Sequence, residues 1–200
     1  MTTTMSGSIH LRADDALIVV DVQKDFLPGG RLAVLDGDAV VPVLNRYLER
    51  FVAHGLPVFA TRDWHPPDHC SFLTRGGPWP PHCVAGNAGA EFASALALPP
   101  AAHIISKATT PDRDAYSGFE GTDLYAQLRA LHVHRLFVGG LATDYCVLNT
   151  VRDGLQRNYA VVVLIDAIRA VNVHPSDGEQ ALAEMQRLGA LSMQLAMLAP

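Results

Sequence analysis

The run ALIVVDV, residues 16–22, decides the fold of this chain. It is apolar up to its aspartate and rich in β-branched residues, which is typical of a β-strand. Because no polar side chain interrupts the run before Asp21, both faces of the strand are expected to be covered, as they are in a parallel sheet. The run therefore predicts a buried strand that ends at a carboxylate.

Similar apolar runs recur along the chain, and stretches of helical period separate them. Strands are expected at 16–22, 56–61, 102–106, 135–139, 160–165 and near 191–195. Helices are expected at 38–53, 122–131, 144–157 and 176–188. This alternation predicts an α/β fold, a three-layer α/β/α domain with a six-stranded, mostly parallel, doubly wound sheet. Ligands of such sheets bind at the carboxyl ends of the strands.

Composition and charge exclude several classes of protein. Apolar residues make up 49% and charged residues 18% of the 200 residues, which indicates one globular domain spanning 1–200 rather than a disordered chain. The net charge of −5, without a cluster of Lys and Arg, argues against a nucleic-acid partner. No run is long enough to span a membrane and no signal peptide is evident, so a cytoplasmic location is expected. Residues 1–14 are expected to form a flexible extension.

A loop after the second predicted strand is dense in metal-binding side chains. DWHPPDH at 63–69 and WPPHC at 79–83 place Asp63 and three histidines within twenty positions. Pro66 and Pro67 exclude a helix there, so the loop must wrap for these side chains to converge. Imidazole nitrogen with one carboxylate suits zinc, iron or manganese, while solvated loop histidines are the alternative.

The segment GLATDYC at 140–146 places a cysteine where a strand gives way to a helix. If Thr143 or Asp144 caps that helix, Cys146 lies in its first turn, where backbone N–H groups favour a thiolate. A buried structural cysteine is the alternative.

Three polar residues follow predicted strands and are expected at one edge of the sheet. These residues are Asp21, Lys107 and Cys146. A cysteine beside a base and a cation can perform acyl transfer, since the cation lowers the thiol pKa and the carboxylate accepts its proton. Taken alone, Asp21 could equally be a metal ligand or the cap of a turn. Nearby aromatic side chains are either loop core or the walls of a pocket, namely Phe26, Trp79 and Tyr116.

Six segments, in order, resemble the nicotinamidase branch of the isochorismatase-like cysteine hydrolases. The resemblance covers about residues 16–190 and rests on IVVDVQKDFLPGG (18–30), TRDWHPPDHCSF (61–72), WPPHCVAG (79–86), SKAT (106–109), DAYSGFEGTDL (114–124) and GLATDYCV (140–147). The intact metal motif argues against the metal-free relatives that cleave isochorismate, N-carbamoyl compounds or other small amides.

The resemblance implies roles for individual residues. The catalytic triad falls on Asp21, Lys107 and Cys146, and the ligands of one divalent metal ion fall on Asp63, His65, His69 and His82. The oxyanion hole is expected from the main-chain N–H groups of Ala142 and Cys146. Substrate contacts are expected from Phe26, Trp79, Tyr116 and Tyr145, the last standing where some nicotinamidases have histidine. Relatives also suggest a cis peptide bond between Leu141 and Ala142.

The resulting hypothesis is a metal-dependent cysteine amidase that converts nicotinamide to nicotinate and ammonia, and that also accepts pyrazinamide. A homo-oligomer is suggested by the family alone. Two alternatives stay open: a catalytically silent small-molecule binding protein with a structural metal clip, and a related amidase of another small amide.

Overall fold

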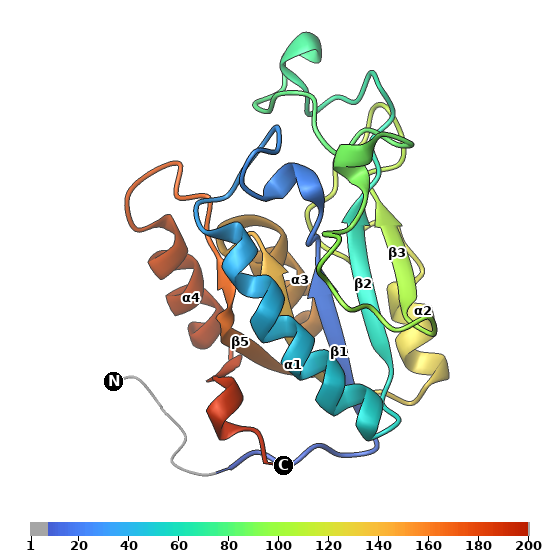
Figure 1. The fold of residues 1–200 in the computed structure, drawn as a ribbon, viewed down its shortest axis with the longest axis vertical. Helices are drawn as coiled ribbons and strands as arrows, with labels where there is room; N and C mark the ends of the chain where they lie inside the picture. Colours follow the sequence, from blue (N-terminus) through green and yellow to red (C-terminus); the bar gives the residue numbers. More distant parts are fainter. Residues whose placement is uncertain (1–7, 200) are drawn as a thin grey trace.

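A computed structural model describes residues 8–199 and contains a six-stranded sheet in the order β3-β2-β1-β4-β5-β6 (Figure 1). All five pairings between neighbouring strands are parallel. The strands are β1 (Asp15–Val20), β2 (Val58–Asp63), β3 (His103–Lys107), β4 (Arg135–Leu141), β5 (Ala160–Arg169) and β6 (Leu191–Met193). This topology confirms the predicted doubly wound α/β fold.

Helices cover both faces of the sheet and bury two apolar clusters against it. The helices are α1 (Val40–Ala53), α2 (Leu124–Ala130), α3 (Leu148–Gln156) and α4 (Asp177–Arg187). The cluster beneath α1 includes Leu44 and Phe51 of that helix. Residues of the other three helices join the second cluster, among them Leu128, Val151 and Met185. The sheet is therefore the middle of three layers, as the apolar strand sequences predicted.

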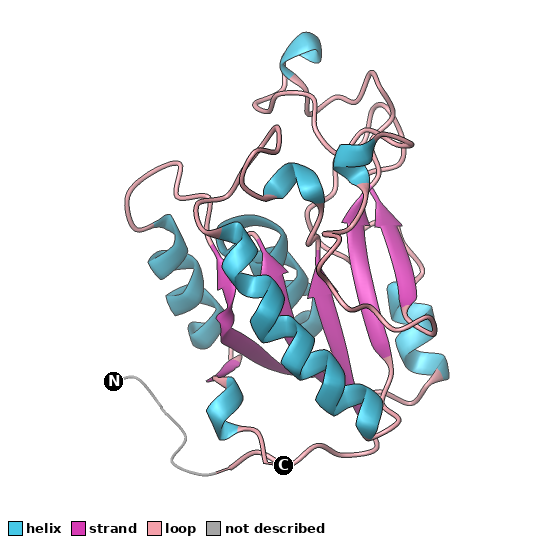
Figure 2. Cartoon of the chain, in the orientation of Figure 1, coloured by secondary structure: helices cyan, strands magenta, loops and turns pink. Residues whose placement is uncertain are grey.

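The strand order reverses direction between β1 and β4. From this point β2 and β3 lie on one side, and β5 and β6 on the other. Chain segments leaving the two central strands diverge to opposite faces of such a sheet, and the crevice between them is where ligands bind. The loops after the strands gather at that end of the molecule, at the top of Figure 2.

Glycine at position 140 allows β4 to lie close to β1. Gly140 has φ +126°, and a Cβ atom there would lie 2.1 Å from the carbonyl oxygen of Val20. The register between β4 and β5 also shifts in this region, between Val138 and Gly140. The close approach therefore occurs directly before the segment that carries Cys146.

Most element boundaries differ by a few residues from those predicted by the sequence, and two of these differences lie next to the site. Strand β1 ends at Val20, because Asp21 turns the chain out of the sheet with φ +48°. The helix predicted from residue 144 begins only at Leu148, after a π-helical turn over Thr143–Val147.

The N-terminal extension predicted at 1–14 falls partly outside the described residues, which begin at 8. Ile9 is buried, and its backbone N–H donates to Met197 while its carbonyl accepts from Ala199. No helix within 8–199 is long and apolar enough to cross a membrane.

Candidate active site

Three buried side chains meet at the carboxyl edge of the sheet, as predicted. Asp21 follows β1, Lys107 is the last residue of β3, and Cys146 lies in the π-helical turn after β4. Their exposed fractions are 0%, 1% and 6%. The aspartate and the cysteine thus flank the point where the strand order reverses.

Lys107 is the centre of this group. Its Nζ lies 2.9 Å from Oδ2 of Asp21 and 3.4 Å from Sγ of Cys146, and it donates to Oδ1 of Asp63 and to the Ala115 carbonyl. One oxygen of each carboxylate and the cysteine sulfur all lie within 4.8 Å of one another. A single ammonium group therefore contacts the thiol and both acids.

The two carboxylate oxygens of Asp21 have different partners, a hydroxyl group at Oδ1 and an ammonium group near Oδ2. Oδ1 accepts a hydrogen bond of 2.6 Å from the hydroxyl of Thr61, a residue that sequence reasoning did not single out. Oδ2 is buried and accepts no hydrogen bond of normal geometry from any described residue, although the ammonium of Lys107 is near. An ion-paired carboxylate oxygen that receives no conventional hydrogen bond from the described residues can still accept a proton from a neighbouring thiol.

Burial and mutual charge shift the pKa values of the triad. Burial raises the pKa of Asp21, and Lys107 offsets part of that increase. Burial also raises the pKa of the Cys146 thiol, again against the opposing effect of Lys107. Burial alone would lower the pKa of Lys107, but Asp21 and Asp63 outweigh it and raise it. The resting site consequently holds a thiol beside an ammonium ion, with a carboxylate of raised proton affinity in reach.

The segment before Cys146 has the expected backbone but no side-chain cap. The Leu141–Ala142 peptide bond is cis, which confirms that prediction. No side chain caps the turn that holds Cys146, so the Thr143 or Asp144 cap that the sequence suggested as a condition is not formed. The Asp144 carboxylate instead accepts hydrogen bonds from the backbone N–H groups of Val171 and Asn172, at 2.9 and 2.8 Å.

The predicted metal ligands converge, although not on one point. Asp63, His65 and His82 offer ligand atoms within 4.8 Å of one another, and all three side chains are buried. His69 forms a second group of the same size with His65 and Asp114. Asp114 belongs to the DAYSGF segment, but nothing in its spacing distinguished it as a candidate ligand.

The cluster of Asp63, His65 and His82 fits a divalent ion. Nδ1 of His65 lies 3.0 Å from the His82 carbonyl and Nδ1 of His82 lies 2.8 Å from the Pro80 carbonyl, so both rings can donate from Nδ1 and offer Nε2 as a ligand. Burial lowers the pKa of His65 to about 4, which keeps its imidazole neutral near pH 7. Burial acts to raise the pKa of Asp63, but Lys107 and the nearby histidines lower it.

His69 is oriented differently from the other two histidines. Its Nε2 lies 3.1 Å from the Arg113 carbonyl and its Nδ1 lies 2.7 Å from the hydroxyl of Ser71. The rings of His65 and His69 still lie close together, with centroids 4.3 Å apart.

The four predicted substrate-contacting aromatic residues lie around this edge in two places. Trp79 donates a 3.0 Å hydrogen bond from Nε1 to the hydroxyl of Tyr116, and the ring of Tyr145 lies 5.1 Å from that of Trp79. The ring of Phe26 instead contacts the ring of His82, with centroids 5.6 Å apart. Aromatic side chains therefore lie next to Cys146 in the sequence and against His82 in the candidate metal cluster.

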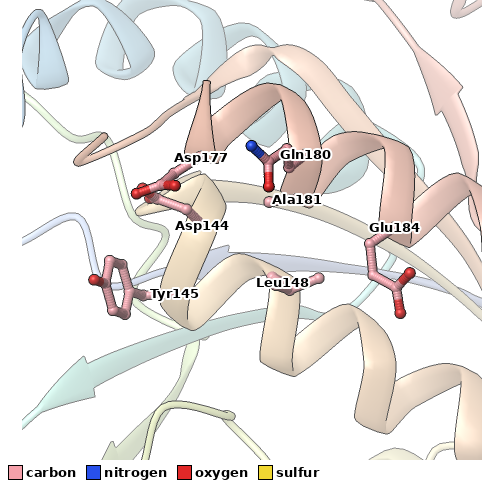
Figure 3. A pocket seen from close by; sticks show the side chains of 7 residues that line it. All are labelled: Asp144, Tyr145, Leu148, Asp177, Gln180, Ala181 and Glu184. Carbon is pink, nitrogen blue, oxygen red and sulfur yellow. The ribbon is translucent and has the colours of Figure 1, made fainter. Parts of the chain in front are cut away.

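A cavity of about 500 Å³ lies between α4 and the segment that carries Tyr145 (Figure 3). Its three carboxylates already have partners: Asp144 holds the 171–172 backbone, Asp177 accepts from the His174 N–H, and Glu184 pairs with Arg187. None of the triad residues lines it, so we place the reaction at the sheet edge and not in this cavity.

The other two cysteines lack the surroundings of a nucleophile. Cys83 is fully buried, and burial raises the pKa of its thiol strongly. Cys70 is half-buried in the loop after His69, and all three thiols are unpaired.

A strand-end thiol with a buried lysine and aspartate, on a doubly wound sheet, defines a class of cysteine hydrolase. The chain belongs to the isochorismatase domain family, whose model matches residues 15–196. It is 39% identical over 202 residues to the nicotinamidase of Escherichia coli strain K12, which covers 90% of this chain and 95% of that protein.

Two solved structures are similar over almost their full length. The pyrazinamidase of Pyrococcus horikoshii in complex with zinc has a TM-score of 0.88 and 50% identity, and the match covers 91% of this chain and 99% of the other. PnC1 from L. infantum in complex with nicotinate also has a TM-score of 0.88, with 35% identity and coverage of 96% and 98%. The predicted family and fold are thereby confirmed.

Proposed function

We propose that this protein hydrolyses nicotinamide to nicotinate and ammonia, and also deamidates pyrazinamide, with Cys146 as the nucleophile. The observation that carries the proposal is the contact of one lysine ammonium with the Cys146 thiol and with both Asp21 and Asp63. Similarity to the zinc-bound pyrazinamidase and to the nicotinamidases supports the choice of substrate.

The first half of the reaction forms a thioester. Asp21 accepts the thiol proton, and the Cys146 sulfur attacks the carboxamide carbon. The resulting oxyanion accepts hydrogen bonds from the main-chain N–H groups of Ala142 and Cys146. When the C–N bond breaks, Asp21 returns the proton to the departing nitrogen, which leaves as ammonia.

The second half releases the acid and restores the thiol. Asp21, again a carboxylate, accepts a proton from a water molecule that attacks the thioester carbonyl. The C–S bond breaks, the sulfur regains that proton from Asp21, and the carboxylic acid leaves and loses its remaining proton to water as nicotinate. Lys107 keeps its positive charge throughout and stabilises the anionic sulfur and carboxylates.

We propose that Asp63, His65 and His82, with His69 beside them, hold one zinc, iron or manganese ion. Such an ion would supply a coordination site for the pyridine nitrogen, which would orient the carboxamide toward Cys146. Phe26, Trp79, Tyr116 and Tyr145 then enclose the ring and exclude water from its faces.

An ammonia-release assay tests the proposal against its alternatives. Nicotinamide should yield ammonia and nicotinate, and alkylation of the thiol should abolish that yield. Turnover that persists after complete alkylation of Cys146 would contradict the assignment of Cys146 as the nucleophile. If the untreated, metal-loaded protein released no ammonia, a catalytically silent binding protein would be favoured. Activity measured in parallel on pyrazinamide, isochorismate and N-carbamoylsarcosine distinguishes a nicotinamidase from a related hydrolase.

The cytoplasmic location and the homo-oligomer expected from the sequence and the family stay predictions.

A further inference from the structure

The loop after β1 contains two buried polar side chains that the proposed chemistry does not use. Gln23 is 0% and Asp25 7% exposed, and both belong to the VQKDF segment directly after the catalytic aspartate. Among the described residues, neither side chain forms a hydrogen bond with Cys146. Both bind the backbone of segments that carry the proposed metal ligands.

Gln23 binds the backbone of Asp63 as a neighbouring strand would. Its Oε1 accepts from the Asp63 N–H at 2.8 Å, and its Nε2 donates to the Asp63 carbonyl at 2.8 Å and to the Ala90 carbonyl at 2.9 Å. The backbone ladder between β1 and β2 has just ended, with the bond from the Asp21 N–H to the Thr61 carbonyl. The side-chain amide thus extends the pairing by two residues, to the point where the Asp63 carboxylate leaves β2.

The opposite side of Asp63 is paired with β3. Asp63 is in register with Lys107, and the Trp64 N–H donates to the Lys107 carbonyl at 3.1 Å. With Gln23 on one side and β3 on the other, the Asp63 backbone has little freedom to turn. Its carboxylate consequently meets the lysine ammonium and the two histidines at a defined position.

Asp25 fixes the other half of the cluster through Cys83, the residue after His82. Oδ2 of Asp25 accepts a 2.7 Å hydrogen bond from the Cys83 N–H, and the Cys83 carbonyl accepts from the His65 N–H at 3.0 Å. Cys83 has φ +46°, a left-handed conformation that a non-glycine residue keeps only when its surroundings enforce it.

The packing around Asp25 leaves no space for another arrangement. A Cβ atom at Gly89 would lie 2.2 Å from Oδ2 of Asp25. Only glycine therefore allows the backbone at position 89 to lie this close to the Asp25 carboxylate. Oδ1 also lies 3.3 Å from the Arg31 N–H. A buried carboxylate held by backbone N–H groups makes strong, charge-assisted hydrogen bonds.

From these contacts we infer that Gln23 and Asp25 are positioning residues that set the separation between Asp63 and His82, and hence the affinity and geometry of the metal site. The inference rests on the proposed metal site. Both tethers start from one short loop, so the distance between the two ligand segments depends on a single rigid element. Removal of hydrogen-bonding partners of metal ligands typically lowers metal affinity by about 10- to 100-fold.

Zinc affinity of the metal-free full-length protein, measured by competition with a chromophoric chelator, tests the inference directly. Gln23→Leu removes all three hydrogen bonds, and Gln23→Glu keeps only the acceptor for the Asp63 N–H. Asp25→Ala removes the Cys83 tether, whereas Asp25→Asn keeps a neutral acceptor. We expect zinc Kd to rise at least about 10-fold for Gln23→Leu and Asp25→Ala, and less for Asp25→Asn.

A matched control separates positioning from general stability. Asn45 on α1 binds backbone in the same manner, donating to the Ala95 carbonyl and accepting from the Ala97 N–H, both at 2.8 Å, and none of these residues belongs to the site. Asn45→Leu should lower Tm while leaving zinc Kd and the KM for nicotinamide unchanged.

Three outcomes of the zinc-binding measurements decide whether Gln23 and Asp25 position the metal ligands. A rise in zinc Kd for the Gln23 and Asp25 variants, with folded circular dichroism spectra and no change for Asn45→Leu, supports the inference. Unchanged zinc Kd in variants whose Tm falls as much as that of Asn45→Leu would overturn it and leave the proposed amidase intact. A wild-type protein that binds no zinc, iron or manganese would overturn both the metal assignment and the positioning role, while thiol-dependent ammonia release would still test the nucleophile.

Discussion

Cys146 is a thiol enclosed with one cation and two carboxylates, and this enclosure decides its chemistry. Burial and the acids disfavour a free thiolate, while Lys107 favours it. In the proposed mechanism the Cys146 thiol therefore needs a nearby group that accepts its proton. Asp21, whose Oδ2 lies 2.9 Å from the Lys107 ammonium, is the proposed acceptor.

Cys146→Ala should abolish turnover, with kcat reduced at least about 1,000-fold, because no other group at the sheet edge can form the thioester. Substrate binding and the folded state should survive, since the change removes one small side-chain atom. Steady-state ammonia release and circular dichroism measure the two effects. Cys70→Ser is the matched control and should retain activity. If Cys70→Ser or Cys83→Ser were inactive while Cys146→Ala kept clear turnover, the assignment would be wrong.

Asp21→Asn should lower kcat at least about 100-fold, because an amide can neither accept the thiol proton nor return it to ammonia. The hydrogen bond from Thr61 can persist with the amide oxygen as acceptor, so the local structure should hold. Measurement of kcat across the accessible pH range checks this expectation. Near wild-type values at any pH would exclude Asp21 as the proton carrier.

At the scale of elements, the strand ends were predictable and the connections were not. The apolar runs indicated the ends of the strands to within two residues, except for β5, which extends to Arg169 instead of 165. This was sufficient to place Asp21, Lys107 and Cys146 at one edge. The π-helical turn escaped prediction because Thr143 and Asp144 match the pattern of a helix cap. Asp144 in fact binds backbone 27 and 28 residues further along the chain, a contact that local sequence does not encode.

Gly140→Ala tests the close approach of β4 to β1. The new methyl group would meet the Val20 backbone at 2.1 Å in a conformation that L-residues rarely adopt, so unfolding free energy should fall by about 3 kcal/mol or more. Gly55→Ala is the control: it also has positive φ, +65°, but nothing lies within 4 Å, and about 1 kcal/mol is expected. Urea denaturation gives both values. Equal losses of unfolding free energy in the two variants would show that the close contact with Val20 does not restrict position 140 to glycine.

For the whole molecule, the reversal of strand order between β1 and β4 brings together residues that are distant in sequence. Periodicity predicted this arrangement, and the motif resemblance predicted the roles. The tethers from Gln23 and Asp25 could not be predicted, because they join residues 40 to 67 positions apart through side-chain atoms. The same holds for Asp114, which lies beside His65 and His69 only once the loops are folded.

The central claim is that a buried thiol and an adjacent metal site act together on a pyridine carboxamide. The most direct test compares kcat/KM for nicotinamide and for benzamide, which keeps the ring shape and the amide but lacks the ring nitrogen. In metal-loaded enzyme, nicotinamide should be favoured at least about 100-fold, since loss of orientation at the reacting carbon costs about that much. Removal of the metal by a chelator should reduce this difference in kcat/KM, because it should lower kcat/KM for nicotinamide far more than for benzamide. Equal kcat/KM for the two amides in metal-loaded enzyme would contradict the account.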